Sequence, residues 1–343
     1  MATQLSTSFT DGTSSDAIQS LFNKRLLMRG VYDHFAMMFV EKKSMGMNKG
    51  KTMIFRRYSA LTRNTTPLTE GVTRTGKSKS KTDVAITIAG YGDWIENSDF
   101  LVGSQPEGVL DDVDQLAQQM GETFDALYFA SIWATGTNVT YANGASESAV
   151  NTLAVYEDYN KALRSLRNNK ARRFTPMIPA SQRVGSGGIM PGHWCMLSES
   201  MWYDVRAGST FDGHFYLASE YPQGAAVRGE AGALDIGIRF LPVPDEAMTA
   251  GSMIVAGGGA TGGDAAVIAE TSNVADVHYA VIVGQQAGCG IDLGIGNGGI
   301  IRKQDGGTSD PLNQRSTIGW KKYDGRGVLN QAFFQTVKSA VSN

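Results

Sequence analysis

The chain has 343 residues, a formal net charge of −2 and 41 glycines. A folded protein of this size buries about 75% of the surface that its unfolded chain exposes, so it needs no disulfide or metal crosslink to be stable. The near-neutral charge argues against a protein devoted as a whole to nucleic acid, and no run of about 18 apolar residues predicts a membrane span. The polar N-terminus lacks a secretory signal pattern, and Cys195 and Cys289 give no disulfide framework, so we expect synthesis in a reducing cytoplasm.

The chain opens with a segment that predicts an arm. A polar start is followed by apolar residues at helical spacing, and Asp16 stands where a helix N-cap is expected. The apolar positions are Ile18, Leu21, Phe22, Leu26, Leu27 and Val31.

A long basic hairpin is predicted next. Residues 52–60 and the stretch "TDVAITIAGYGDWIEN" have the alternating apolar pattern of strands, and a polar tip of about fifteen residues joins them. The stretch from Arg57 to Lys81, "RYSALTRNTTPLTEGVTRTGKSKSK", holds six Lys or Arg and one acid, Glu70; we call it the finger. Because a two-stranded hairpin is marginal in water, the finger needs a surface that covers it.

A long helix is predicted from Val109 to Ala134. Apolar residues recur every three or four positions along it, and Ser104 and Glu107 have the spacing of a capping box just upstream. At 1.5 Å per residue the helix is about 39 Å long, which is unusual for a globular protein. Its apolar stripe is Val113, Leu116, Ala117, Met120, Phe124, Leu127 and Tyr128.

The remaining chain predicts a mixture of helices and strands. Residues 153–173 have acids at the start and bases at the end, as the helix dipole favours. "HWCML" predicts a short buried strand, and Ser198 opens a short helix after it. Beyond Gly224, strands alternate with glycine turns, and residues 328–341 predict a strand and then a helix. The fold class is therefore α+β.

Charge is segregated along the chain. Residues 42–81 hold eleven Lys or Arg and one acid, whereas residues 82–160 hold thirteen acids and no Lys or Arg. These segments are either two solvated faces of a monomer or complementary surfaces that meet between copies. A hairpin that projects from its own body reaches the helix of a neighbour more readily than its own, and such head-to-tail contacts close rings or shells. The candidate inter-subunit contacts are Arg57, Arg63, Arg74, Lys77, Lys79, Asp111, Asp112, Asp114 and Glu122.

Several stretches together carry a family resemblance. "RYSALTRNTTPLTEGVTRTGKSKSKTDVAITIAGYGDWIENSD" resembles a segment of tailed-bacteriophage major capsid proteins of the coliphage N-four type. Four later stretches resemble the same family in the same order: "HWCMLSESMWYDVR", "GEAGALDIGIRFLPVP", "VHYAVIVGQQAGCGIDL" and "SDPLNQRSTIGWKKYDGRGVLN". The chain departs from the pattern at Leu197, Ser198 and Glu199, where a His-Pro pair is expected, and the arm and "AGGGATGGD" match nothing in it.

The resemblance implies the Hong Kong ninety-seven capsid fold. In that fold an extended loop lies over the peripheral domain of an adjacent subunit, which gives the finger its covering surface. The implied division is an N-terminal arm at 1–49, an extended loop hairpin at 50–95, a peripheral domain with a long spine helix at 96–150, an axial domain at 151–265, and return strands with the C-terminus at 266–343.

The resemblance also implies a structural role. It predicts a major capsid protein that assembles into the icosahedral head of a tailed bacteriophage around double-stranded DNA, present in the virion and made in the host bacterial cytoplasm. Its partners would be copies of itself in hexamers and pentamers, packaged DNA held without sequence specificity, and portal, scaffold or decoration proteins. We expect no catalytic residue, cofactor, metal or membrane partner.

Alternative functions stay open at this point. A bacterial nanocompartment shell of the same fold would need a cargo-binding groove near its N-terminus. A nucleotide-binding enzyme is suggested by Gly294, Gly296 and Gly299, but that motif needs a following helix, and here a strand and a loop are predicted. The basic finger, with Tyr58 among arginines, suggests a nucleic-acid-binding module.

Covalent chemistry has weaker support. Some relatives of the fold join a loop lysine to a neighbour's asparagine, and Lys77, Lys79 and Lys81 are candidate donors. No Asn and Glu of this chain match that motif residue by residue. Cys195 lies in an apolar stretch, so a small buried hydrophobe is favoured over a nucleophile.

Overall fold

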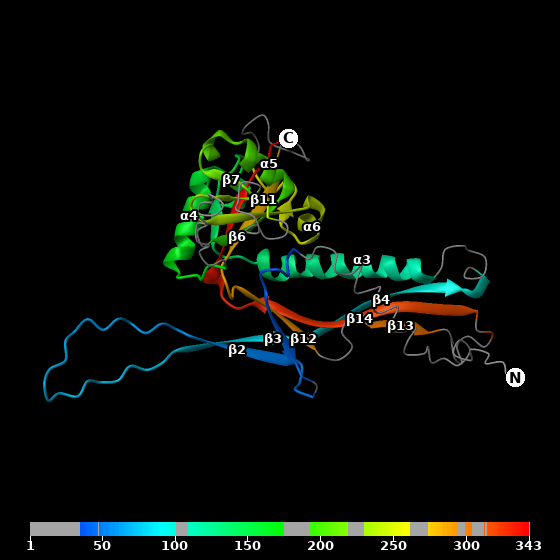
Figure 1. Ribbon diagram of the computed structural model, residues 1–343, viewed down its shortest axis with the longest axis horizontal. Helices are drawn as coiled ribbons and strands as arrows, with labels where there is room; N and C mark the ends of the chain where they lie inside the picture. The colour runs from blue at the N-terminus through cyan, green and yellow to red at the C-terminus, as the bar shows by residue number, and fades with distance from the viewer. Residues whose placement is uncertain are drawn as a thin grey trace, which may run out of the picture.

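The computed structural model describes residues 35–46, 48–100, 109–174, 192–218, 230–260, 274–293, 299–303, 312 and 314–342. The arm helix predicted around residues 16–31 and the capping box of Ser104 and Glu107 lie outside these ranges. The described part forms three units, a compact lobe, a long helix-on-sheet spine and a projecting hairpin (Figure 1).

The lobe is built on an eight-stranded sheet. Its strand order is β5 (Val139–Tyr141), β15 (Phe334–Ser339), β11 (Val277–Val283), β6 (His193–Ser198), β9 (Ile238–Val243), β8 (Gly232–Leu234) and β7 (Phe215–Leu217), with β10 (Ile254–Val255) also paired to β11. The central strands β6 and β11 are buried along their whole length.

Two hydrophobic layers cover the two faces of this sheet. On one face, Cys195 and Leu197 of β6 pack with α4 (Tyr156–Asn168) and α5 (Glu199–Ala207). On the other face, Trp194 and Met196 pack with Met248 of α6 (Asp245–Ala250) and with the spine. Alternate residues of one strand therefore enter different cores, as the period of a strand requires.

Local signals place α4 and α5 where the sequence predicts helices, whereas α6 lies in a region where strands and turns were predicted. Ser198 caps α5, since its hydroxyl accepts a hydrogen bond from Met201 N at 3.2 Å. The predicted helix at 153–173 is α4, with acids in its first turn and Arg167 in its last. The helix predicted near the C-terminus is wrong, because that segment is β15, paired with β5 on one side and β11 on the other.

The spine packs one long helix on a five-stranded sheet. The helix α3 (Val109–Tyr128) lies along β4 (Ala89–Ser98) and β14 (Arg315–Val328). The strand β14 pairs with β4 along one edge and with β13 (Gly299–Lys303) and then β12 (Gly288–Leu293) along the other. The strand β1 (Glu41–Met45) pairs in parallel with β12.

The predicted apolar stripe of the long helix faces this sheet. Val113, Leu116, Met120 and Phe124 are buried, and the Phe124 ring lies 5.8 Å from that of Trp320. The helix changes to a π-helical turn at Phe129–Trp133, where Ala134 N donates to Phe129 O at 2.8 Å. The predicted span to Ala134 is thus helical but not uniformly α-helical.

The hairpin pairs β2 (Thr52–Tyr58) with β3 (Lys81–Thr87). Its tip covers residues 59–80, longer than the predicted fifteen or so, because the ladder ends at Tyr58 and Lys81. The following strand, β4, pairs with β14 and belongs to the spine sheet, although the sequence division placed its first part in the hairpin. At the base, Met53, Phe55 and Ile86 pack on β1 and β12.

Candidate assembly interface

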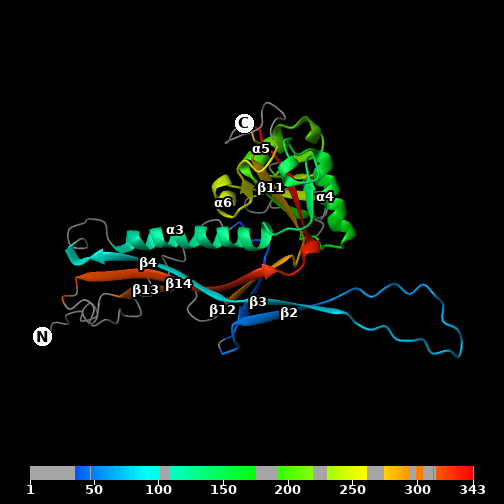
Figure 2. The same cartoon turned by 180° about the vertical axis from the view of Figure 1, so that it is seen from behind.

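The finger stands clear of the rest of its chain. Every residue from 56 to 83 is exposed, and both views show the hairpin extending in the direction opposite to the start of α3 (Figures 1 and 2). Across the hairpin strands, next to the finger, Arg56 Nε and Nη2 donate to the two carboxylate oxygens of Asp83 at 2.8 and 3.1 Å. The guanidinium holds the pKa of that carboxyl below its usual range.

The basic candidates lie along this exposed hairpin. Lys77 Nζ donates to the backbone carbonyl of Thr62 and to its Oγ1 at 2.8 Å, which ties the two stems together. The side chains of the other four form no hydrogen bond or ion pair with any described residue of the chain: Arg57, Arg63, Arg74 and Lys79. Their charges are available to another surface.

The acidic candidates differ from one another in their surroundings. Asp112 is half-buried and accepts a hydrogen bond from Asn97 Nδ2 at 2.6 Å, so it is tied to β4. Glu122 is exposed and accepts from Gln118 Nε2 at 2.8 Å. Asp114 is half-buried, and the side chain of Asp111 lies outside the described residues. The structure of one chain does not bring these acids to the finger.

An acidic groove of about 650 Å³ runs between α3 and α6. Asp114 and Glu122 of α3 and Glu246 of α6 line it, together with Asp125 at its base. Asp125 is only 6% exposed because the segment before β1 packs on it. Its Oδ1 accepts from Ala36 N at 2.9 Å, and burial raises its pKa to about 6.

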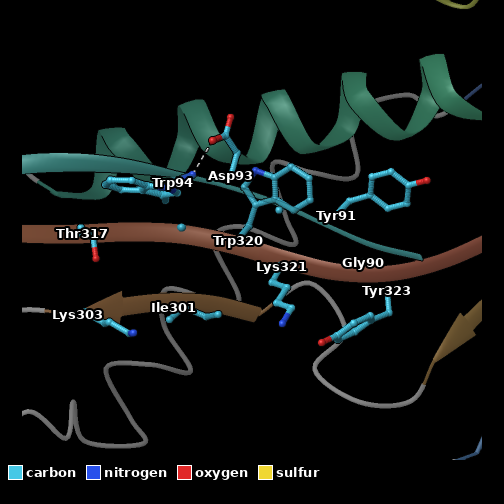
Figure 3. Close-up of a pocket in the computed structure, with 12 residues that line it drawn as sticks. Gly90, Tyr91, Asp93, Trp94, Ile301, Lys303, Thr317, Trp320, Lys321 and Tyr323 are labelled. Atoms are coloured by element: carbon cyan, nitrogen blue, oxygen red, sulfur yellow. Dashed lines mark hydrogen bonds between the residues drawn. The ribbon is translucent and has the colours of Figure 1, made fainter. Parts of the chain in front are cut away.

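A second groove, of about 710 Å³, lies on the spine sheet across β4, β13 and β14 (Figure 3). Tyr91 and Trp320 pack on Phe124 of α3, so their neighbours along each strand point to the opposite face. We call this the sheet-face groove. Figure 3 shows its side chains, with Trp94, Thr317, Ile301 and Lys303 toward one end and Lys321 and Tyr323 toward the other.

Glycines form the floor of the sheet-face groove because no larger residue fits there. A Cβ at Gly319 would lie 2.7 Å from both Asp93 O and Trp94 Cβ, and one at Gly92 would lie 2.6 Å from Trp320 O. Gly90 lies beneath the Tyr323 ring. Sequence reasoning missed this groove, although the glycines that flank Tyr91 and precede Trp320 are a local signal of a strand face without side chains.

Cys195, the residue considered as a nucleophile, is buried in the lobe. His193 and Cys195 lie on β6, where burial lowers the pKa of His193 to about 4 and raises that of Cys195. In the described part, the element after the glycine-rich stretch is the strand β13, where a dinucleotide site needs a helix. None of the described helices is both long and apolar enough to cross a membrane.

Comparisons with known proteins find similarity in structure only. No family model matches the sequence, and no curated protein matches it. The capsid of Ralstonia phage GP4 superposes with a TM-score of 0.62 at 11% identity, covering 89% of this chain and 88% of that one. The capsid of cyanophage P-SCSP1u gives 0.56 at 15% identity, covering 89% and 87%. The head of Helicobacter pylori bacteriophage KHP40 gives 0.55 at 13% identity, covering 90% of both chains.

At identities this low, the structural similarity establishes the fold alone. The similarity spans about nine tenths of each chain. The protein is an α+β chain with the Hong Kong ninety-seven-like capsid fold predicted from its sequence.

Proposed function

We propose that this chain is the major capsid protein of a tailed bacteriophage of the coliphage N-four type. Copies of it would assemble into an icosahedral head that encloses double-stranded DNA. The observation that carries the proposal is the finger, which is exposed from residue 56 to residue 83 and leaves four cations without a partner in the described chain. The structural similarity to phage capsids supports the same role.

The finger explains why assembly is favourable. A two-stranded hairpin has too few contacts to be stable alone, so it gains order when a neighbour covers it. We propose that its cations approach the acids of a neighbouring spine, from among Asp112, Asp114 and Glu122, with Asp111 a further candidate. Each exposed ion pair contributes only about 0.2–1 kcal/mol. A shell repeats the contact in every subunit, so these small contributions add up over the assembly.

We assign a part of the capsid fold to each segment of the chain. The segment 1–49 serves as the arm, 50–95 as the extended loop, 96–150 with part of 266–343 as the peripheral domain, and 151–265 with the rest as the axial domain. Hexamers and pentamers of the chain form the shell, and portal, scaffold or decoration proteins complete it. The chain takes no catalytic step.

The proposed relation to DNA is confinement. The net charge of −2 provides no excess of cations for the phosphates. Packaged DNA would then contact the shell without sequence specificity and be released at physiological salt, since few counterions are displaced on binding.

The test is the state of the purified chain. Expressed alone in bacteria, it should form closed shells in negative-stain images and a matching mass by light scattering. Monomers and dimers as the only species at high protein concentration would contradict the proposal. Shells that enclose a cellular enzyme would favour a nanocompartment instead.

A further inference from the structure

A short segment before β1 joins the spine to the lobe. Residues 35–40, which we call the strap, form an irregular turn in which Met38 N donates to Phe35 O at 3.3 Å. Ala36 and Phe39 of the strap are buried. Because the strap forms neither a helix nor a strand, its attachment depends on the side chains that surround it.

The spine holds the backbone of the strap at one residue. Asp125 Oδ1 of α3 accepts a hydrogen bond from Ala36 N at 2.9 Å, and Trp133 Nε1 donates to Ala36 O at 2.9 Å. Side chains thus satisfy the backbone donor and acceptor of a buried residue. Loss of either partner would leave a buried polar group unpaired, so the two side chains form a specific clamp on the strap.

The lobe holds the other end of the strap through aromatic rings. The Phe39 ring stacks on that of Trp194 of β6 with the centroids 5.4 Å apart, and it meets the Phe174 ring edge-on at 5.6 Å. The lobe and the spine have separate sheets, and Ala36 and Phe39 lie in the hydrophobic core that the two units share. The strap therefore closes the joint between them.

The clamp on the strap contains a carboxyl group in acidic surroundings. Asp125 lies at the base of the acidic groove, where the other titratable side chains are Asp114 and Glu122 of α3 and Glu246 of α6. The strap itself has no titratable side chain. Burial raises the pKa of Asp125 to about 6, and nearby carboxylates act in the same direction. With the strap docked, the group is neutral in mild acid and charged at neutral pH.

We propose that the strap is a pH-sensitive latch between the lobe and the spine, with Asp125 as its controlling group. A docked strap buries Asp125, whereas an undocked strap exposes it to solvent. Protonation therefore favours docking, and this contribution is complete below pH about 4 and is lost as the pH rises through about 6. The latch holds firmly in acid and less firmly at neutral pH.

Release of the latch has a defined consequence for the molecule. It uncovers Trp133 and Trp194 at the joint and the floor of the acidic groove. It also frees the point through which residues 1–34 connect to the rest of the chain. The inference stands apart from the proposed function, because every contact that carries it lies within one copy.

Hydrogen exchange measured by mass spectrometry tests the latch in the purified full-length chain. Protection of the strap peptide, corrected for the intrinsic effect of pH on exchange, should fall about 25-fold between pH 4.5 and pH 7.5, as expected for a pKa of about 6 when docked and about 3.9 when undocked. The matched control Asp125→Asn should show no such fall, since its amide oxygen accepts the hydrogen bond without titrating. Light scattering must show the same assembly state at both pH values.

The comparison of the two proteins isolates Asp125. His34, the residue before the strap, titrates near pH about 6.5, but it is present in both proteins and its effect cancels. An equal fall in wild type and Asp125→Asn would overturn the role of Asp125. Strap protection equal to that of β11 at both pH values would show that the strap opens only when the whole chain unfolds, and the latch would be wrong.

A second variant tests the contact with the lobe. Phe39→Leu keeps an apolar side chain but loses the ring contacts with Trp194 and Phe174. Its strap should be about tenfold less protected at both pH values, while the ratio between the two pH values stays as in wild type. The control Met38→Leu changes an exposed position of the same turn and should leave protection unchanged. Wild-type protection in Phe39→Leu would show that the lobe does not hold the strap.

Discussion

The lobe and the finger represent opposite ways of using a polypeptide. In the lobe, the central strand β11 is buried from end to end, and its side chains fill two cores. In the finger, no residue from 56 to 83 is buried. The lobe is therefore stabilised by its own chain, whereas the finger depends on contacts that only another molecule supplies. A mutation in the lobe or spine should change folding, and one in the finger should change assembly.

Met120→Pro should have the largest effect on folding. Met120 is buried at the centre of α3, and proline removes a backbone hydrogen bond and clashes with the preceding turn. The cost is about 3 kcal/mol or more, and we expect no soluble protein. Expression and thermal unfolding measure it, with Met120→Leu as the volume-matched control. Wild-type expression of the proline variant would contradict the packing of α3 on the spine sheet.

Gly319→Ala tests the difference between the spine and the finger with a smaller expected loss of stability. The added methyl would lie 2.7 Å from Asp93 O, so β14 must move away from β4, at about 1–3 kcal/mol. Gly76→Ala in the finger is the matched control, because nothing lies within 4 Å of the added methyl there. Urea unfolding should show a loss for the first variant and no loss for the second. Equal effects would mean that the spine and finger backbones are equally constrained.

Asp125→Asn tests whether the spine buries a carboxyl group. Its folded pKa of about 6 exceeds the unfolded value near 3.9, so the folded state disfavours the charged form. The stability that Asp125 contributes is present below pH about 4 and is lost as the pH rises through 6. Between pH 4.5 and pH 7.5, the free energy of unfolding of the variant should rise by about 2 kcal/mol relative to that of wild type. The titration of His193 affects both proteins equally and cancels in this difference.

Urea unfolding at the two pH values measures this difference. The amide oxygen of the substituted side chain can still accept the hydrogen bond from Ala36 N, so the fold is kept. A stability difference that is independent of pH would show that solvent reaches the carboxyl group.

The structure of a region can be predicted from the sequence where one local pattern determines it, and cannot be predicted where segments distant in the chain pack together. The stripe of α3 repeats with the helical period, and the finger is marked by its charge, so both were predicted. The strand β15 was misread because Phe334, Gln335 and Thr336 are all buried between two strands, which removes the alternation of a half-exposed strand.

The candidate site shows the same limit. An exposed position is expected for Asp125 from its residue type alone, whereas the packing of Phe35 and Ala36 buries it. The sheet-face groove combines residues of β4, β13 and β14, which are far apart in the chain and adjacent only through their ladders. No local pattern predicts such a juxtaposition.

The smallest effect per contact is expected in the stems of the finger. Replacing Arg74, Lys77 and Lys79 by Glu should leave the monomer folded, because none of them forms an ion pair with a described residue of its own chain. Each lost pair with a neighbour costs only about 0.2–1 kcal/mol, yet every subunit loses it. Light scattering should show impaired assembly, most severely at low salt, where charges are least screened. The control Ser78→Gln changes the same stem without changing its charge. Normal assembly of the triple variant at low salt would mean that apolar contacts, and not charge, attach the stems to the neighbouring spine.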